Sequence, residues 1–453
     1  MLKKKKRLGD SVDRLSTLPD DTLCHILSFL PTKISVSTST LSKRWRSIWA
    51  HVPTLDFNPE DYADVMVGIP YIISRVMSLH KAQTLDALRL ISLPDYNDFE
   101  LETVVLIAMS RNVKNIHFEL NSCTLPRHLF TITTLVRLEI PGSRIYYKTG
   151  GNVHLPCLKW LHLGRLQFQV DEDLPGLLSG CPVLEELILN SVSFAEKKSG
   201  CFNVSSSSLK RLTVNRVGRI YDSDHGLDCS VEINAPALIY LNASLASRSI
   251  SVSPMTSLVE ANIDIYRRAM NHEDDNYISM VKFLDCLCHV KCLTLGGSYN
   301  EKFVDMALAA PFIMFDNLKK LVYQPCGDWH LLGKLLKVAN NLEVLIVSNF
   351  SRSGSKDINR CWDWEEQVPA CVSSHLKTIR ISGMTEVETE QNCNVRYLLE
   401  NAKVLEKLEI ITQWHSGSPT EQMTKLVEFL SSIVRGSEAC ELVVRRSLYC
   451  ICA

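Results

Sequence analysis

The sequence has no long apolar run and almost no net charge, and each absence excludes a class of protein. A membrane-spanning helix needs about 20 predominantly apolar residues, and no stretch of the 453 residues approaches that length. The 49 Lys and Arg residues nearly balance the 50 Asp and Glu residues, which gives a formal net charge of −1. Nucleic-acid-binding proteins usually carry a clear basic excess. We therefore expect no membrane and no nucleic acid among the partners.

Motifs that mark catalytic or metal sites are also missing. The chain has no Gly-x-x-x-x-Gly-Lys-Ser/Thr loop, no Gly-x-Ser-x-Gly elbow and no His-Glu-x-x-His pair. Cys286, Cys288, His289 and Cys292 lie close together, but structural zinc sites usually combine two separated ligand pairs, and no second pair follows. We predict a chain that is not an enzyme and that has no metal site and no cofactor. A small molecule in a groove of the fold is left open.

The first residues, MLKKKKRLGD, have no apolar stretch behind them, so we expect no secretory signal. The 16 cysteines are scattered, and in a long chain without a signal they indicate free thiols in a reducing compartment. We predict a basic disordered tail over residues 1–9. Alternatively, Lys3 to Arg7 is a nuclear import patch. The expected location is the nucleus or the cytoplasm, and the basic run slightly favours the nucleus.

A Leu-x-x-Leu-x-Leu string recurs through the middle and the end of the chain, about every 27 residues, which lies in the range of leucine-rich repeats. Copies begin at Leu85, Val113, Leu135, Leu158, Leu184, Leu209, Leu238, Val290, Leu318, Leu342, Leu376 and Leu405, with a degenerate copy at Leu258. Each Leu-x-Leu pair points to one face of a short strand, and stacked units cover that face. The pattern predicts an α/β solenoid, an irregular horseshoe with a parallel sheet. Asp173–Ser179, followed by Gly180 and Pro182, predicts one of its helices.

Residues that alternate with the strand leucines face the open, concave side, where repeat proteins usually bind partners. From these we predict a target-binding set: Arg89, His117, Arg137, His162, Val322, Val344 and Ile346. The early positions are charged, whereas the late ones are aliphatic. They indicate a partner groove with an apolar patch near its C-terminal end. The alternative is that strand faces simply carry some residue there and that a loop covers part of the late sheet.

The stretch before the repeats has a helical period instead. Pro19 suits a first helical position, and Leu23, Ile26, Leu27 and Leu30 form an amphipathic stripe that Pro31 ends. A second helix is expected over residues 33–41. A third begins near Ser42 and carries Trp45 and Trp49 one turn apart. Three short helices rarely form a stable domain alone, so the repeats or a second protein should cover their excess apolar residues.

Residues 10–57, DSVDRLSTLPDDTLCHILSFLPTKISVSTSTLSKRWRSIWAHVPTLDF, resemble a plant F-box. The positions that match are Leu18-Pro19, Ile26-Leu27, Phe29-Leu30-Pro31, Thr38-Ser39, Leu41-Ser42-Lys43-Arg44-Trp45 and Trp49. The stretch departs from the family over Lys33–Ser37, where an acidic residue and then often an arginine are usual. WEEQVPAC from Trp364, LKTIRISG from Leu376 and YLLENAKVLEKLEI from Tyr397 resemble an FBD region.

This resemblance implies a substrate-recognition subunit of an SCF-type cullin–RING ubiquitin ligase. The F-box would dock on the Skp-type adaptor and, through it, on the cullin, while the repeats would bind an unknown target protein. The adaptor-binding residues implied by the family pattern are Leu18, Pro19, Leu23, Ile26, Leu27, Leu30, Pro31, Trp45 and Trp49, and some of these must instead hold the three helices together. The alternative is a repeat scaffold unrelated to ubiquitin, whose F-box-like helices only cap the solenoid.

The predicted organisation has five parts. They are a basic tail over residues 1–9, an F-box over 10–57, leucine-rich repeats over 58–360, an FBD-like region over 361–412 that continues the solenoid, and a C-terminal helix and cap over 413–453.

Overall fold

The structure is a computed structural model, and it describes residues 15, 17–62, 68–93, 97–147, 151–195, 199–217, 228–245, 249–265, 282–297, 314–325, 330–348, 367–384, 391–412 and 419–446. The predicted tail, its basic run and residues 361–366 of the FBD-like region lie outside this part. The chain forms two compact units. Unit 1 is Met1–Gln167 with Gly180–Pro182, and unit 2 is Phe168–Ser179 with Val183–Ala453.

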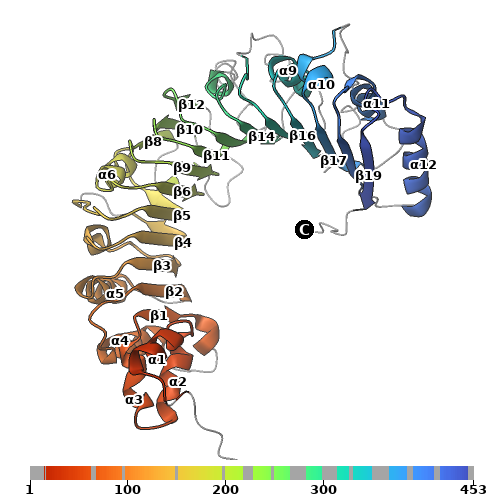
Figure 1. The fold of residues 1–453 in the computed structure, drawn as a ribbon. Coiled ribbons are helices and arrows are strands. Elements are labelled where there is room, and N and C mark those ends of the chain that lie inside the picture. The colour runs from red at the N-terminus through yellow and green to blue at the C-terminus, as the bar shows by residue number, and fades with distance from the viewer. Residues whose placement is uncertain are drawn as a thin grey trace, which may run out of the picture. The chain divides into compact units, whose positions relative to one another are not determined.

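Unit 1 begins with short helices that we call the helical segment, residues 20–51 (Figure 1). Its elements are α1 (Asp20–Leu27), α2 (Thr32–Ser37), the 3-10 turn η1 (Thr38–Thr40), α3 (Trp45–Ile48) and the 3-10 turn η2 (Trp49–His51). Pro19 is the N-cap of α1 rather than its first residue. The second predicted helix is split into α2 and η1, and the third is split into α3 and η2.

The rest of unit 1 alternates parallel strands with helices. The strands are β1 (Thr54–Phe57), β2 (Ala87–Leu93), β3 (Asn115–Leu120), β4 (Arg137–Tyr146) and β5 (Trp160–Phe168), paired in that order. The other elements are η3 (Pro59–Tyr62), α4 (Ile69–Leu79), α5 (Asp98–Ser110) and η4 (Arg127–Thr131). Asn97 and Glu100 form a capping box that fixes the start of α5, since each side chain accepts a hydrogen bond from the other's backbone N–H.

Unit 2 continues the same pattern. Its main sheet is parallel, in the order β6 (Glu186–Asn190), β9 (Arg211–Asn215), β11 (Tyr240–Leu245), β13 (Glu260–Ile265), β14 (Cys292–Gly297), β15 (Lys320–Pro325), β16 (Val344–Ser348), β17 (Thr378–Met384), β18 (Lys407–Thr412) and β19 (Glu441–Arg446). Its helices are α6 (Asp173–Ser179), α9 (His330–Val338), α10 (Ala370–Ser374), α11 (Gln391–Asn401) and α12 (Pro419–Ser432). The helix predicted over Asp173–Ser179 is confirmed.

Part of the helix side of unit 2 is formed by strands instead. β8 (Ser199–Ser205), β10 (Asp228–Asn234) and β12 (Ser249–Val252) form a small parallel sheet in the order β12-β10-β8, and a short strand β7 (Ser193–Phe194) precedes it. The rings of Phe194 and Phe202 stack at 4.4 Å beneath this layer. The repeat pattern did not predict these strands, because it marks only the strand of each unit that faces the concave side.

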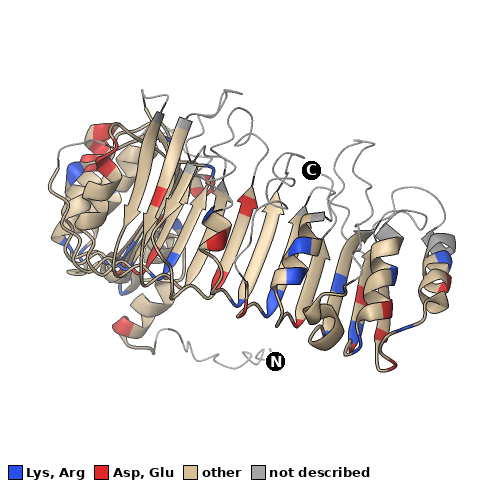
Figure 2. Ribbon diagram, turned by 90° about the horizontal axis from the view of Figure 1, so that it is seen from above, with Lys and Arg blue, Asp and Glu red and all other residues tan. Residues whose placement is uncertain are grey.

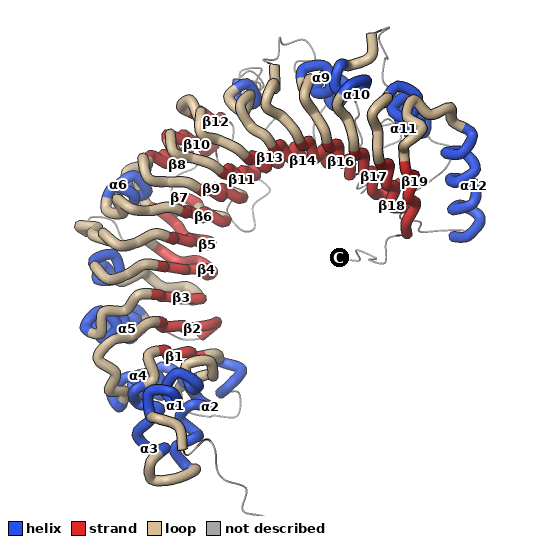
Figure 3. Tube along the Cα trace, viewed as in Figure 1, coloured by secondary structure: helices blue, strands red, loops and turns tan. Residues whose placement is uncertain are grey.

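The repeated leucines form the core in both units. Leu184, Leu187 and Leu189 of one copy are fully buried, as are Leu85, Leu88 and Leu90 of another. Burying one leucine is worth about 2 kcal/mol as an upper estimate, and one repeat has too few to fold alone. Within each unit the helices lie on one side of the sheet and leave the other side open (Figure 3). The α/β solenoid prediction is confirmed.

Two features of the described chain bear on partners. Basic and acidic residues are interspersed along the helices and strands rather than separated by sign (Figure 2). Among the described residues, none of the helices is both long and apolar enough to span a membrane. The C-terminal segment holds α12 and then the additional strand β19, where the sequence predicted a helix and a cap.

Candidate functional site

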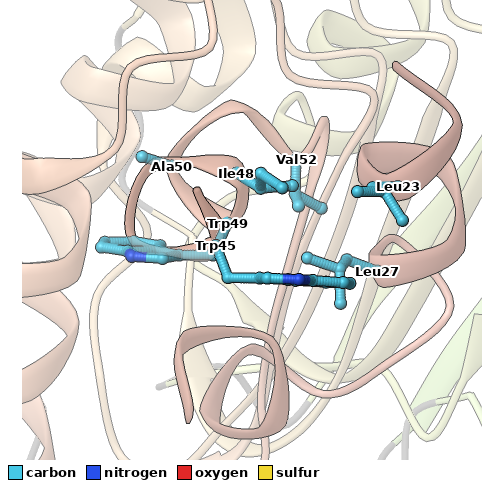
Figure 4. Packing of buried hydrophobic residues seen from close by; sticks show 7 residues of the cluster. All are labelled: Leu23, Leu27, Trp45, Ile48, Trp49, Ala50 and Val52. Atoms are coloured by element: carbon cyan, nitrogen blue, oxygen red, sulfur yellow. The ribbon is translucent and has the colours of Figure 1, made fainter. Parts of the chain in front are cut away.

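Seven buried side chains, six from the helical segment and one from Val52 directly after it, form a single hydrophobic core (Figure 4). They are Leu23, Leu27, Trp45, Ile48, Trp49, Ala50 and Val52. Leu23 and Leu27, one turn apart on α1, face the side chains of α3 and η2. Val76 of α4 is partly buried against the same cluster, so the helical segment also packs on the first helix of the repeats.

This core divides the residues that the family pattern implies for adaptor binding, some of which were expected to hold the three helices together. Leu23, Leu27, Trp45 and Trp49 are all less than 10% exposed, and their side chains pack in the core of the segment. The predicted stripe on α1 divides, because Leu23 and Leu27 are buried in this core while Ile26 is 39% exposed. Leu30 comes after the end of α1 at Leu27, so the helical period does not predict which way its side chain points.

Other large apolar side chains, in the helical segment and just before it, are exposed. Six of the twenty large hydrophobic side chains that are exposed among the described residues fall between Leu15 and Leu41. Their exposed fractions are Leu15 54%, Ile26 39%, Phe29 74%, Leu30 38%, Ile34 46% and Leu41 67%. We call these six residues the exposed apolar set. Such a concentration of exposed apolar side chains is typical of a protein-interaction surface.

Of the other predicted residues, Pro19 is exposed and Leu18 and Pro31 are half-buried. Sequence reasoning missed Leu15, Phe29, Ile34 and Leu41 as candidates. Phe29 and Leu41 do lie at family positions of the F-box resemblance. A clearer signal is that each follows the end of a helical element, where a large apolar side chain has no helix face to turn inward.

Polar contacts hold the backbone that presents this set. Arg44 binds Asp20 at 2.6 Å and also donates to the carbonyl oxygen of Leu18, which ties α3 to the chain before α1. The Leu18 N–H donates to the carbonyl oxygen of Leu15 at 3.1 Å. Two long-range contacts of one guanidinium therefore fix residues 18–20 against the rest of the segment.

The helical segment also covers the start of the repeat sheet. The backbone N–H of Asp56 in β1 points away from β2 and donates to Oγ1 of Thr32 in α2 at 2.8 Å. Leu55 and Phe57 of β1 are fully buried. The helical segment therefore satisfies the outward donor of Asp56 on this edge strand, and a covered edge is protected from further pairing.

Candidate reactive or ligand sites among the described residues include several cysteines and a cavity. Burial, followed by the charges of Asp20 and Asp21, raises the pKa of the Cys24 thiol, so Cys24 stays protonated and is a poor nucleophile. A cavity of about 240 Å³ between α4 and α5 has mainly apolar walls, and the carboxylate of Glu100 in its lining serves the α5 capping box. Burial also raises the pKa of Cys286 and of Cys288. Within the described residues, no group of three or more His, Cys, Asp and Glu side chains is placed to hold a metal ion.

On the open face of unit 1, the structure brings the predicted charged residues together. Strand register aligns Asp56, Arg89, His117, Glu139 and His162 across β1 to β5, and we call them the polar row. His117 Nδ1 lies 2.9 Å from Glu139 and His162 Nδ1 lies 3.4 Å from it. Burial would raise the pKa of Glu139, but the hydrogen bonds and charges of His117 and His162 outweigh it and lower that pKa.

Arg137 lies beside the polar row. Its guanidinium stacks 3.5 Å above the Trp160 ring and approaches Glu139 at 3.5 Å. Stacking on an aromatic face fixes the plane of an arginine and leaves N–H donors on its edge. All four early target-binding candidates thus belong to one preorganised polar surface.

The three late candidates lie on adjacent strands of unit 2. Val322 of β15 is directly opposite Ile346 of β16, and Val344 lies two residues before Ile346 on the same strand. All three are half-buried. Next in the row, Arg380 forms hydrogen bonds of 2.8 Å with Glu409, whose side chain is only 5% exposed. The aliphatic group therefore borders an ion pair in which Glu409 is buried and Arg380 is about half exposed.

Comparison with known proteins matches these parts one by one. A family model described as F-box domain matches residues 15–56, one described as the LRR repeats of FBD-associated F-box protein At5g56370 matches residues 101–247, and one described as FBD matches residues 365–410.

Curated relatives from Arabidopsis thaliana are similar to this chain from end to end. The putative FBD-associated F-box protein At5g56440 is 32% identical, over 95% of this chain and 99% of its own length. The F-box/FBD/LRR-repeat protein At1g78750 is 30% identical, over 96% of each chain. The putative F-box/FBD/LRR-repeat protein At4g13965 is 28% identical, over 98% of this chain and all of its own length. This chain therefore belongs to the plant family of F-box/FBD/LRR-repeat proteins.

Proposed function

We propose that this chain is a non-catalytic substrate receptor of an SCF-type ubiquitin ligase. Members of this family generally serve as such receptors, and F-box domains generally bind Skp1-type adaptors. The observation that carries the proposal is the division of apolar residues in the helical segment. One set closes its own core, while the exposed apolar set stays on the surface although burial of these side chains would be favourable.

The test is binding of the full-length chain to the purified Skp1-type adaptor. Replacement of Phe29 and Leu41 by serine removes the two most exposed members of the set. We expect adaptor affinity to fall by about 100-fold or more, since buried apolar anchors at interfaces are each worth about 2 kcal/mol. Because both side chains are solvent-exposed, the thermal unfolding midpoint should stay unchanged.

Leu106→Ser is the matched control, because Leu106 is also an exposed large apolar residue, at 43%, but lies on α5. It should leave adaptor binding intact. A soluble, folded chain that does not bind the adaptor would contradict the receptor proposal.

A specific observation also favours the alternative of a scaffold with a helical cap. The segment does cap the sheet, through the bond from Asp56 to Thr32 and the burial of Leu55 and Phe57. The two roles use different surfaces, since the capping contacts face β1 while the exposed apolar set does not take part in them. Binding that Phe29→Ser/Leu41→Ser abolishes would favour the receptor role.

We further propose that the repeats hold the target, with the polar row and Arg137 contacting polar groups and the group of Val322, Val344 and Ile346 contacting an apolar one. Captured target proteins should be lost from an Arg137→Ala/Arg89→Ala variant that still binds the adaptor. For location, we propose the nucleus or the cytoplasm, and removal of Lys3 to Arg7 in a fluorescent fusion tests the nuclear share.

A further inference from the structure

The last strand of the solenoid is an open edge within the described part of the chain. β19 pairs with β18 on one side, and among the described residues no strand pairs on its other side. Leu442 and Val444 are in register with Leu408 and Ile410, which are buried. Yet Leu442 and Val444 are only half-buried. The end of the core is thus incompletely covered there.

This differs from the first strand. At β1 the outward N–H of Asp56 is satisfied by Thr32, and both inward side chains are buried. Repeat proteins need a cap at each end of their core, and uncapped edge strands invite pairing with another chain. The contrast points to a partner strand for β19.

The backbone groups that this partner would meet can be identified. The Glu441 N–H donates to the Glu406 carbonyl oxygen at 2.9 Å, and the Arg445 carbonyl oxygen accepts from Thr412 Oγ1 at 3.3 Å, so both residues bond toward β18. Alternate residues of a strand bond to the same neighbour. The N–H and C=O groups of Leu442 and Val444 therefore point to the open edge.

We propose that a second copy of this chain pairs antiparallel with β19, about a two-fold axis at Val443. In this register Leu442 lies opposite Val444 of the second copy, and the two residues exchange both of their main-chain hydrogen bonds. Because the pairing is symmetric, it forms four such bonds and joins the two half-covered apolar edges. Both residues lie on the core side of the sheet, where Leu408 and Ile410 already pack.

Pairing of opposite charges between the two copies favours this same antiparallel register. On the open face, Glu441 lies opposite Arg445 of the second copy, at both ends of the pairing. Arg445 has an exposed side chain and contacts Glu409 at 3.4 Å with one nitrogen, so its other donors are accessible to a second carboxylate. A shift by two residues would place Leu442 opposite Arg446, and an odd shift would set core-side residues against open-face ones. Self-pairing is the complementary arrangement for the sequence ELVVRR.

Sedimentation of the full-length chain over a range of concentrations tests this proposal. We expect a reversible shift from the 51.2 kDa monomer to twice that mass. Glu441→Arg and Arg445→Glu should each weaken self-association by about tenfold, because like charges then face each other. An equal mixture of the two variants should restore the dimer, because each charge then meets its opposite in the other copy.

Val444→Pro tests the main-chain bonds. It removes one outward N–H per copy and leaves the bonds to β18 in place, so the chain should stay folded by circular dichroism but lose the dimer. Val434→Glu is the control for non-specific association through exposed apolar side chains, because Val434 is 82% exposed and lies outside β19. It should leave the dimer intact.

Three results would overturn the proposal. One is a chain that stays monomeric at all concentrations. Another is a dimer that Glu441→Arg, Arg445→Glu and Val444→Pro leave intact, or that mixing the charge variants does not restore. The third is a monomer that dimerises only after removal of residues 447–453, because the chain's own last residues would then occupy the edge.

Discussion

Arg111 Nη1 donates a hydrogen bond of 2.6 Å to Nδ1 of buried His80, at the C-terminal end of α4. His80 Nε2–H in turn donates to the Val52 carbonyl oxygen at 2.7 Å, beside the core of the helical segment. Arg111 also donates to the carbonyl oxygens of Met77 and His80. These bonds require a neutral imidazole with its proton on Nε2. A proton on Nδ1 would remove the bond from Arg111, so this chain of bonds between the F-box and the first repeats is complete only while His80 is neutral.

Stability should for this reason depend on pH through His80. Burial, aided by the charge of Arg111, lowers the pKa of His80 below its ordinary value of 6.5 despite the hydrogen bond to Val52. Protons then bind the unfolded state preferentially, so the stabilisation is present above about pH 6.5 and is lost as the pH falls toward the lowered pKa. We expect the free energy of unfolding to fall by up to about 1.4 kcal/mol per pH unit from this group.

Denaturation at several pH values, compared between the wild type and His80→Gln, isolates this contribution from the other histidines. Glutamine can donate to Val52 and accept from Arg111 but does not titrate. Parallel pH profiles of the two proteins would contradict the assigned role.

The two sets of apolar residues in the F-box should separate in mutagenesis. Leu27→Ala removes a buried side chain from the core and should destabilise unit 1 by about 2–5 kcal/mol. Phe29→Ala, two residues away, removes a side chain that is 74% exposed and should change stability by less than about 0.5 kcal/mol. Chemical denaturation of both variants measures the difference. Equal losses would mean that Phe29 belongs to the core.

The bond between α2 and β1 should contribute measurably to the cap. Thr32→Val keeps the shape of the side chain and removes the acceptor for the Asp56 N–H, which is then left buried and unsatisfied. We expect a loss of about 1–3 kcal/mol in the free energy of unfolding. Thr40→Val, at an exposed position of η1, is the matched control and should be nearly neutral.

The buried carboxylate of Glu409 should depend on Arg380, although the Arg380 side chain is 48% exposed. Arg380→Met removes one of the two ion pairs that Glu409 forms in the described structure. The carboxylate then keeps only the 3.4 Å contact with Arg445. We expect destabilisation by about 1.5–3 kcal/mol, the range of hydrogen bonds to charged groups. Glu409→Leu combined with Arg380→Met should recover part of it, because the buried charge is then gone. Lys114→Ala, which breaks an exposed pair with Asp86, should have little effect.

The fold was predictable because the repeat is a local signal. The Leu-x-Leu spacing fixes which side chains of a strand face inward, and stacking follows from the exposed apolar face of every unit. Even the degenerate copy at Leu258 precedes a full strand, β13. The alignment of Arg89, His117 and His162 in the polar row was predictable for the same reason, since parallel register aligns corresponding positions of successive repeats, whereas Asp56 precedes the first repeat copy.

Only the tertiary structure shows which apolar residues of the F-box are buried and which are exposed. Helical period predicted one stripe through Leu23, Ile26, Leu27 and Leu30, but α1 ends at Leu27 and only two of these side chains reach the core. Phe29 and Leu41 are exposed because the chain turns there, and a turn has no periodic signal. The pairing of Arg111 with His80 and of Thr32 with Asp56 joins residues far apart in sequence, so their partners are set by packing and not by any local pattern. Sequence alone determined what repeats and what family pattern is present, while three-dimensional contact determined which apolar residues are buried in the core and which stay exposed.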